Sequence, residues 1–383
     1  MIAGPGAFLK KIKSQAHLDG IFLLLVALLA TYGTLMVFSA GYYYAGTRYG
    51  DEYYFIKRQA LWLVIGVAAM LISSKIDASV YKRATPLVYI CTLALLVTVL
   101  VFGFVGNGAQ RWISIGPVTI QPSEIAKIAL VMSLARYFDE NSARALSLKD
   151  KRTMLVHGTI IPIFIMLVPI VLVMLQKHLS CIIILGTIGV LMIVASGAGL
   201  RFLGGFMGAG VAGVSALALL TDYTKERITV WQNPEAHKLT GGWQTLQGLM
   251  AIGSGGLFGV GFGKSLLKHS YVSEPANDMI FAILCEELGL VGGVLMILLF
   301  GALILRGFHI AMRAEDFFSR MLTIGIITKT AIQMLLNVAV VTNSIPNTGI
   351  SLPFFSYGGS SLVMLFFEMG IILSVSKKAK ITK

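Results

Sequence analysis

Charged residues are scarce in this sequence. Asp, Glu, Lys and Arg make up 13% of the 383 residues, whereas a soluble domain usually carries about a quarter. No polar segment is long enough to form a soluble domain of its own. We therefore expect a single membrane domain over residues 1–383, with lipid as the main solvent.

Cysteine is also rare, and its placement excludes a metal or disulfide framework. Cys91, Cys181 and Cys285 each stand within an apolar run. Their number is odd, and no spacing between them fits a zinc site. We expect all three to be small buried apolar side chains.

Motifs of several common enzyme classes are absent as well. The sequence has no HExxH and no GxSxG, and no Gly-Lys-Ser/Thr follows the glycine-rich stretch 253–263 at the spacing that a phosphate loop requires. That stretch instead predicts close backbone packing. The net charge of +13 does not indicate nucleic acid, because the basic residues lie between apolar runs and form no basic stripe or arm.

Long apolar runs dominate what is present. A membrane-spanning helix needs about 20 mostly apolar residues. The chain therefore predicts an all-α polytopic fold with about ten spans. They are 20–40, 59–74, 85–104, 124–138, 155–175, 179–196, 202–220, 278–305, 321–342 and 361–375.

Loop charge predicts the orientation. With the N-terminus inside, most loop Lys and Arg residues fall on the inner side, which indicates two cytoplasmic termini and an even number of spans. The first apolar run is then an anchor and not a cleaved signal peptide. Three outer segments result: 105–123, a long extracellular loop at about 221–277 between spans seven and eight, and 343–360. Apolar residues recur at helical spacing over 246–252, so part of the long loop is expected to lie on the membrane or dip into it.

Several charges fall where a bilayer makes them costly, and each is a functional-site hypothesis. They are Glu124, Lys127, Asp278, Glu286, Glu287, Lys329 and Glu368. Simpler interpretations stay open. Glu124 and Lys127 have the spacing of a structural ion pair, and Asp278 could cap a helix start.

Two further residues have alternative interpretations. Arg111, beside Trp112, suits phosphate recognition but also a membrane-interface anchor. His178 is more typical of a structural role than of a ligand or base. On residues alone, the chain is an enzyme acting on a lipid-linked substrate or a transporter.

Three collinear stretches carry a family resemblance. They are Gly108-Ala109-Gln110-Arg111-Trp112-Ile113 with Gln121-Pro122-Ser123-Glu124 and Lys127; GSGGLFGVGFG (253–263) with Asp278-Met279-Ile280-Phe281-Ala282 and Glu286-Glu287-Leu288-Gly289; and Pro346-Asn347-Thr348-Gly349-Ile350 with the run 352–361. Together they resemble the SEDS family, the FtsW/RodA/SpoVE group of peptidoglycan polymerases. The run 342–349 is more similar to division-type than to elongation-type members, and a sporulation role is not separated from these.

The resemblance implies a function and a site. Members polymerise lipid II into β-1,4 glycan strands and release undecaprenyl diphosphate, with Asp278 as the expected general base. The residues implied to bind substrate are Arg111, Lys127, Glu124, Gln244, Lys329, Ser356 and Ser360. His178 stands where members typically have Asp, so no acid role is assigned there.

The resemblance also implies partners and a location. A class B penicillin-binding transpeptidase and other divisome or elongasome membrane proteins are expected in the bacterial plasma membrane. A divalent cation, Mg²⁺ or Mn²⁺, is allowed, although no ligand cluster for it is visible. Two alternatives remain: a flippase for a lipid-linked precursor, which the charges Glu124, Lys127, Lys329 and Glu368 motivate, and a scaffold that only recruits partners.

Overall fold

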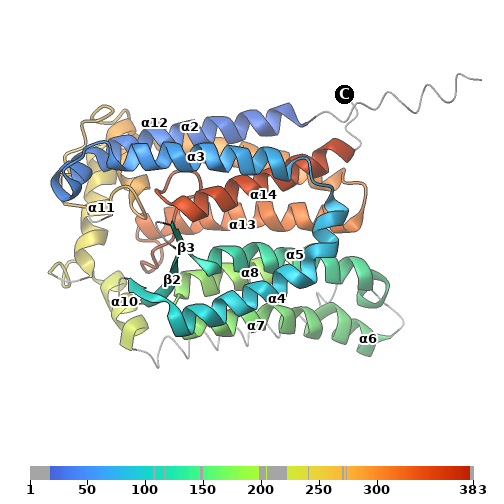
Figure 1. Ribbon diagram of the computed structural model, residues 1–383. Coiled ribbons are helices and arrows are strands. Elements are labelled where there is room, and N and C mark those ends of the chain that lie inside the picture. Colours follow the sequence, from blue (N-terminus) through green and yellow to red (C-terminus); the bar gives the residue numbers. More distant parts are fainter. Residues whose placement is uncertain are drawn as a thin grey trace, which may run out of the picture.

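The protein is a bundle of long helices capped at one end by loops, two short helices and a small sheet (Figure 1). This computed structural model describes residues 18–106, 109–115, 118–146, 150–197, 204, 222–239, 241–269, 271–272 and 274–379. Helices dominate the described residues, which confirms the expected all-α class. The predicted span 202–220 lies, apart from residue 204, outside them.

Each predicted span within the described ranges coincides with helix. In chain order the helices are α2 (Gly20–Tyr49), α3 (Tyr54–Ser73), α4 (Ala78–Phe102), α5 (Pro122–Ala145), α6 (Lys151–Leu155), the π-helix η1 (Val156–Ile160), α7 (Ile161–Leu175), α8 (Leu179–Ala195), α10 (Asp222–Gln232), α11 (Gly242–Ser254), α12 (Ile280–Met312), α13 (Phe317–Val341) and α14 (Gly359–Lys378). Among the described residues, seven helical segments are long and apolar enough to cross a bilayer, with α6, η1 and α7 counted as one, and α8 is a shorter apolar helix. The α5 helix is more polar because it carries several charges.

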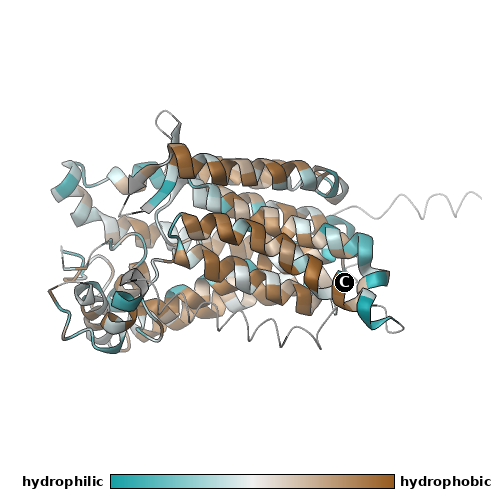
Figure 2. Cartoon of the chain, turned by 90° about the horizontal axis from the view of Figure 1, so that it is seen from below, coloured by the Kyte–Doolittle hydropathy of each residue, from teal (hydrophilic) through white to brown (hydrophobic). Residues whose placement is uncertain are grey.

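Apolar colour follows the middle of the long helices, and hydrophilic residues gather toward the ends (Figure 2). The first and last described helices share one end of the bundle. The Asp19 amide, just before α2, donates to Ser376 Oγ near the end of α14 at 3.3 Å, and Arg306 holds the Asp19 carboxylate at 2.7 Å.

The centre of the bundle is formed by α13 and α14. In each, 67% of the apolar window is buried, compared with 22% in α3 and α4, whose outer faces are left for lipid. The prediction that all three cysteines are buried is wrong for Cys91, which is exposed on α4, and holds for Cys181 and Cys285. A small apolar side chain on a peripheral membrane helix contacts lipid as readily as protein, so apolar context alone did not decide its burial.

The outer segment 105–123 is not the plain loop that we expected. It forms three antiparallel strands in the order β1-β2-β3, namely β1 (Phe104–Gly106), β2 (Ala109–Ile115) and β3 (Val118–Ile120). The dipeptide Asn107-Gly108 between the first two is a strong hairpin signal that could have predicted the pairing. The sheet lies at the same end of the bundle as α10 and α11 (Figure 1).

The glycine-rich stretch of the long loop supplies hydrogen-bond partners where α12 is interrupted. At Gly289 the backbone is non-helical, with φ of 67°. The N–H groups of residues 260 and 261 bond to the carbonyls of Glu286 and Glu287 at 2.9 and 3.0 Å, and residues 290 and 291 donate to the carbonyls of residues 256 and 257 at 2.9 and 3.1 Å. The loop thus satisfies the backbone groups that the break leaves free, as a bilayer requires.

This insertion needs close backbone contact. A Cβ on Gly259 would lie 2.1 Å from the carbonyl oxygen of Glu287, and one on Gly255 would lie 1.9 Å from that of Cys285. The structure therefore shows the close packing that the glycines predicted. The helical spacing over 246–252 is also borne out, because these residues belong to α11.

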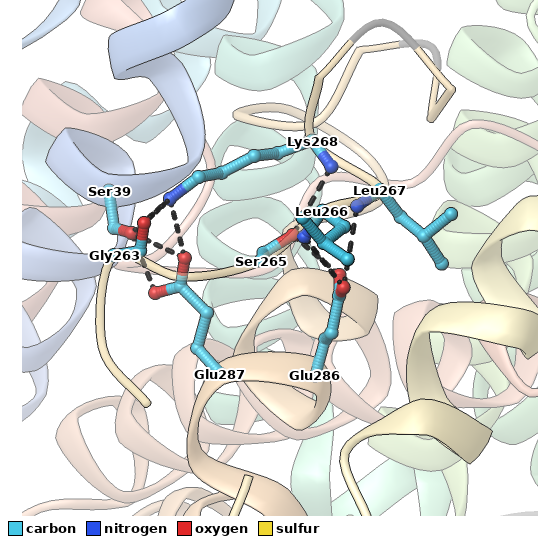
Figure 3. A network of polar contacts seen from close by, with 8 residues as sticks. All are labelled: Ser39, Gly263, Ser265, Leu266, Leu267, Lys268, Glu286 and Glu287. Carbon is cyan, nitrogen blue, oxygen red and sulfur yellow. Dashed lines mark hydrogen bonds and ion pairs between the residues drawn. The ribbon is translucent and has the colours of Figure 1, made fainter. Parts of the chain in front are cut away.

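A buried polar network fixes the rest of the loop to the bundle (Figure 3). Lys268 donates to Glu287 at 2.7 Å, to Ser39 of α2 at 3.1 Å and to the carbonyl of Gly263 at 2.8 Å. The neighbouring Glu286 accepts from the amides of residues 266 and 267. The two adjacent carboxylates of α12 therefore serve the loop and do not line the cavity described next.

Candidate active site

A cavity of about 540 Å³ lies at the end of the bundle that carries the sheet. Its walls come from the starts of α3, α5, α8 and α14, from β2 and β3, and from the segments that precede α12 and α14. Six of the eight residues that the sequence assigned to the site line it, namely Asp278, Arg111, Lys127, Glu124, Ser356 and Ser360. Glu274 and Asn277 of the long loop also line it, so the fold brings together residues from all three outer segments.

Asp278 lies in the turn just before α12. The N-cap of this helix is Met279 and no side chain caps it, so the helix-cap interpretation of Asp278 is wrong. Burial and the nearby Glu274 carboxylate raise the pKa of Asp278 to about 6, against the opposing effect of Arg227 and Arg111. A carboxylate whose pKa lies near the working pH is better suited to accept a proton than an ordinary Asp.

Arg111 projects from β2 and lines the same cavity as Asp278. One terminal nitrogen of its guanidinium donates to the carbonyl of Lys177. Its Nε is buried and has no hydrogen-bond partner among the described residues. The guanidinium has five N–H donors and lines the cavity, so its terminal nitrogens keep donor capacity for an anion that enters. Its neighbour Trp112 also lines the cavity.

Two ion pairs lie in or beside the cavity. Lys127 Nζ lies 2.7 Å from Glu124 Oε1, with side chains only 3% and 11% exposed. Lys329 of α13 pairs with Glu368 of α14. Lys329 does not line the main cavity but a small neighbouring one of about 20 Å³, which Glu124 also lines. All four intramembrane charges are therefore paired, as burial in a low dielectric demands.

His178 lies in the turn between α7 and α8 and lines the cavity. Its Nδ1 is 3.3 Å from Ser123 Oγ. Burial, and then the charge of Arg111, lower the pKa of His178 to about 3, so the ring is neutral at physiological pH. The cavity therefore gains a polar group at this position but no charge.

The remaining predicted residues differ in whether they line the cavity. Ser356 Oγ donates to the carbonyl of Asn277 at 2.9 Å, and Ser360 lines the cavity near the start of α14. Gln244 of α11 does not line the cavity, and instead accepts a hydrogen bond from Asn347 at 3.2 Å. Gln244 thus contacts the segment beside the cavity.

The sequence analysis missed the contribution of α3. Arg58 and Trp62 line the cavity, and the Arg58 guanidinium lies 4.2 Å from the ring centre of Tyr54. Arg58 stands at the start of a span beside aromatic residues, which is the usual pattern of an interfacial anchor. Only the fold shows that this helix end faces the cavity.

Arg227 of α10 was also missed. It donates to the carbonyl of Asn347, and Trp231, one turn later, donates to the carbonyl of Asn343 at 2.9 Å. The i, i+4 spacing of these two residues on a helix was the available signal. Together they fix α10 to the segment that follows α13.

The arrangement of His, Cys, Asp and Glu side chains does not favour a resident metal ion. Among the described residues, no group of three or more His, Cys, Asp or Glu side chains could hold one. We therefore derive no chemical step through the divalent cation that the family resemblance allows.

Fold and cavity together define a polytopic helical membrane protein with a charged site at one membrane face. Residues 19–381 match the FtsW/RodA/SpoVE family model, described as cell cycle protein. The chain belongs to this family, as the sequence resemblance predicted.

Curated relatives cover nearly the whole chain. Stage V sporulation protein E of Bacillus subtilis (strain 168) is 38% identical over 94% of this chain and 98% of its own length. A probable peptidoglycan glycosyltransferase FtsW of Geobacter metallireducens is 34% identical over 97% and 98%. A solved chain from a peptidoglycan synthase complex that coordinates polymerization and crosslinking shares the fold, with a TM-score of 0.76, 24% identity and coverage of 94% and 97%.

Proposed function

We propose that this chain polymerises lipid II into β-1,4-linked glycan strands and releases undecaprenyl diphosphate. Its enzyme class is that of its relatives: the chain is a peptidoglycan glycosyltransferase of the SEDS type. The observation that carries the finer proposal is that Asp278 and Arg111 line one cavity at a membrane face. A base and an anion-binding group are the two elements that this transfer needs.

The reaction is a single displacement. The 4-hydroxyl of the acceptor GlcNAc attacks C1 of the donor sugar, and the bond from C1 to the diphosphate oxygen breaks. The Asp278 carboxylate takes the hydroxyl proton as the new bond forms, which a raised pKa of about 6 favours. One displacement converts the α-linked diphosphate into a β linkage, so no covalent enzyme intermediate is needed.

Positive charge assists the leaving diphosphate. Arg111, whose side chain lines the cavity, is the primary group for this role. Lys127 and Glu124 form the charged end of the cavity. The other residues proposed to contact or support the substrate are Lys329, Ser356, Ser360 and Gln244.

We place the cavity on the outer face of the bacterial plasma membrane, with both termini in the cytoplasm. Loop charge supports this orientation, and so does the contact between the start of α2 and the end of α14. Precursor that reaches the outer leaflet then meets Asp278 directly.

We further propose a role in division, with a class B penicillin-binding transpeptidase as partner among other divisome membrane proteins. The run 342–349 supports the division assignment over elongation. The structural likeness to a chain of a synthase complex supports a crosslinking partner. Depletion of the protein should then give filaments with few septa, whereas rounded cells would indicate elongation.

The direct test is polymerisation of lipid II by the purified full-length chain with its transpeptidase, analysed by gel. Asp278→Asn should lower the rate about 10²- to 10⁴-fold, because it removes the base and keeps the shape. Unchanged polymerisation by a folded Asp278→Asn protein would remove Asp278 as the base. Translocation of lipid II in proteoliposomes with no polymer formed would favour the flippase alternative.

A further inference from the structure

The backbone that carries Asp278 is held from outside its own segment. Three consecutive carbonyl oxygens before α12 each accept a hydrogen bond from α13 or from the segment that follows it. The contacts are Tyr357 N to Ala276 O at 2.8 Å, Ser356 Oγ to Asn277 O at 2.9 Å and Asn337 Nδ2 to Asp278 O at 3.0 Å. The turn that presents the carboxylate is therefore fixed residue by residue.

Asn337 makes the most specific of these contacts. Its side chain is fully buried on α13. The same amide nitrogen donates a second hydrogen bond, to the carbonyl of Ile350 at 2.6 Å. Both hydrogens of the amide are thus engaged, which fixes its orientation. Its carbonyl oxygen has no partner among the described residues, so holding these two backbone carbonyls is the polar role that the structure gives to Asn337.

The second carbonyl belongs to a segment that runs close beside the Asp278 carboxylate. Gly349, one residue before Ile350, adopts φ of +65°, and a Cβ placed on it would lie 3.1 Å from Asp278 Oδ2. The Gly349 backbone is therefore a wall beside the carboxylate. Asn337 connects this wall to the backbone of Asp278 itself.

Ser356 complements this arrangement. Its hydroxyl hydrogen is donated to the Asn277 carbonyl, and its oxygen accepts from the Leu352 amide at 2.7 Å. A hydroxyl has one hydrogen to donate, so the contact to Asn277 uses it. This geometry favours a supporting role for Ser356 behind the carboxylate.

We propose that Asn337 is a positioning residue that sets the orientation of the Asp278 carboxylate through the backbone of residue 278 and the wall at 349–350. The proposal rests on the proposed function, because it needs Asp278 to act on the substrate. It predicts loss of turnover with little loss of substrate binding, since Asn337 does not line the cavity. A misplacement of about 1 Å is enough to lower a rate about 10²-fold.

The test uses the full chain with its transpeptidase and lipid II. Asn337→Leu keeps the approximate volume and removes both donors. The matched control is Thr330→Val on the same helix, because Thr330 is buried and, within the described part of the chain, its hydroxyl bonds only to the carbonyl of Ile326. We expect Asn337→Leu to lower kcat about 10- to 100-fold with KM within about twofold, and Thr330→Val to change neither.

A second readout does not depend on activity. Hydrogen exchange of the peptide covering 274–284, measured in lipid nanodiscs, should be faster in Asn337→Leu than in wild type and unchanged in Thr330→Val. Ser356→Ala removes the neighbouring contact to Asn277 and should also make hydrogen exchange of this peptide faster. This variant is the replacement test if Asn337→Leu does not fold. Wild-type kcat together with wild-type exchange in a folded Asn337→Leu protein would overturn the proposal.

Failure of the base can be told apart from failure of the positioning role. If Asp278→Asn polymerises normally, the proposed base is wrong whatever Asn337 does. If Asp278→Asn is inactive but Asn337→Leu turns over normally, only the positioning role is wrong. Equal losses in Asn337→Leu and Thr330→Val would indicate a general packing effect and would also overturn it.

Discussion

Lys268 Nζ lies 2.7 Å from Glu287 Oε1, and this ion pair joins the outer loop to a membrane helix. The side chains are 4% and 0% exposed. Ser39 of a second helix completes the contact by donating to Glu287 at 2.6 Å. The loop that leads to Asp278 is thus fixed to two spans by one charge pair.

Removal of Lys268 should therefore destabilise the protein. In Lys268→Met the Glu287 carboxylate stays buried without its cation, at a cost of about 3–5 kcal/mol. We expect a clearly lower melting temperature in detergent, followed by tryptophan fluorescence. The double variant Lys268→Met/Glu287→Leu should recover much of the loss, because it removes the unpaired charge.

Lys57→Met is the control for this prediction. The side chains of its ion pair with Asp51 are 66% and 40% exposed, so the melting temperature should not change. A melting temperature for Lys268→Met equal to that of Lys57→Met would contradict this interpretation.

Gly259→Ala should disrupt the insertion of the loop into the break of α12. The new Cβ would lie 2.1 Å from the Glu287 carbonyl oxygen, and φ at this position is +77°. Left-handed backbone alone costs a non-glycine residue about 1–2 kcal/mol, and the clash adds to it. Proteolysis of the loop in nanodiscs should become faster. The matched control Gly253→Ala has no atom within 4 Å of its Cβ and should leave the cleavage rate unchanged.

The rate of polymerisation should depend on the protonation of Asp278. Its raised pKa of about 6 means that the carboxyl is protonated below that pH and ionised above it. Because a general base must be ionised, the rate should fall about tenfold per pH unit below 6 and level off above about 7. His178 should add no second step in this range, because its pKa is lowered to about 3. A profile that stays flat from pH 5 to 8 would contradict the role of Asp278.

Arg111→Ala should slow glycosyl transfer by more than any loss of folded protein explains. Loss of one group that stabilises developing charge typically costs about 10²- to 10³-fold in rate. Arg111→Lys should recover only part of it, since an ammonium lacks the planar fork. Arg144→Ala, which changes an exposed residue near the end of α5, should polymerise at the wild-type rate. Equal rates for Arg111→Ala and wild type would exclude a role at the diphosphate.

The apolar runs alone determined the class of this protein. Backbone groups in lipid must be satisfied within the segment, so runs of about 20 apolar residues can only be helices. The same logic marked Asp278, Lys127 and Glu124 as unusual, and the glycines of 253–263 as sites of close backbone contact. These inferences are local, because each depends on one segment and its solvent.

Tertiary structure decided everything that depends on two distant segments. Only the fold shows that Arg58 faces the cavity, that Lys329 finds Glu368, and that Cys91 faces outward. The break of α12 at Gly289 is likewise tolerated because a loop about 30 residues earlier supplies its hydrogen bonds. Asn337 has no sequence signal of its own, since a buried Asn is defined by its partners, and these are backbone carbonyls that come together only in the folded chain.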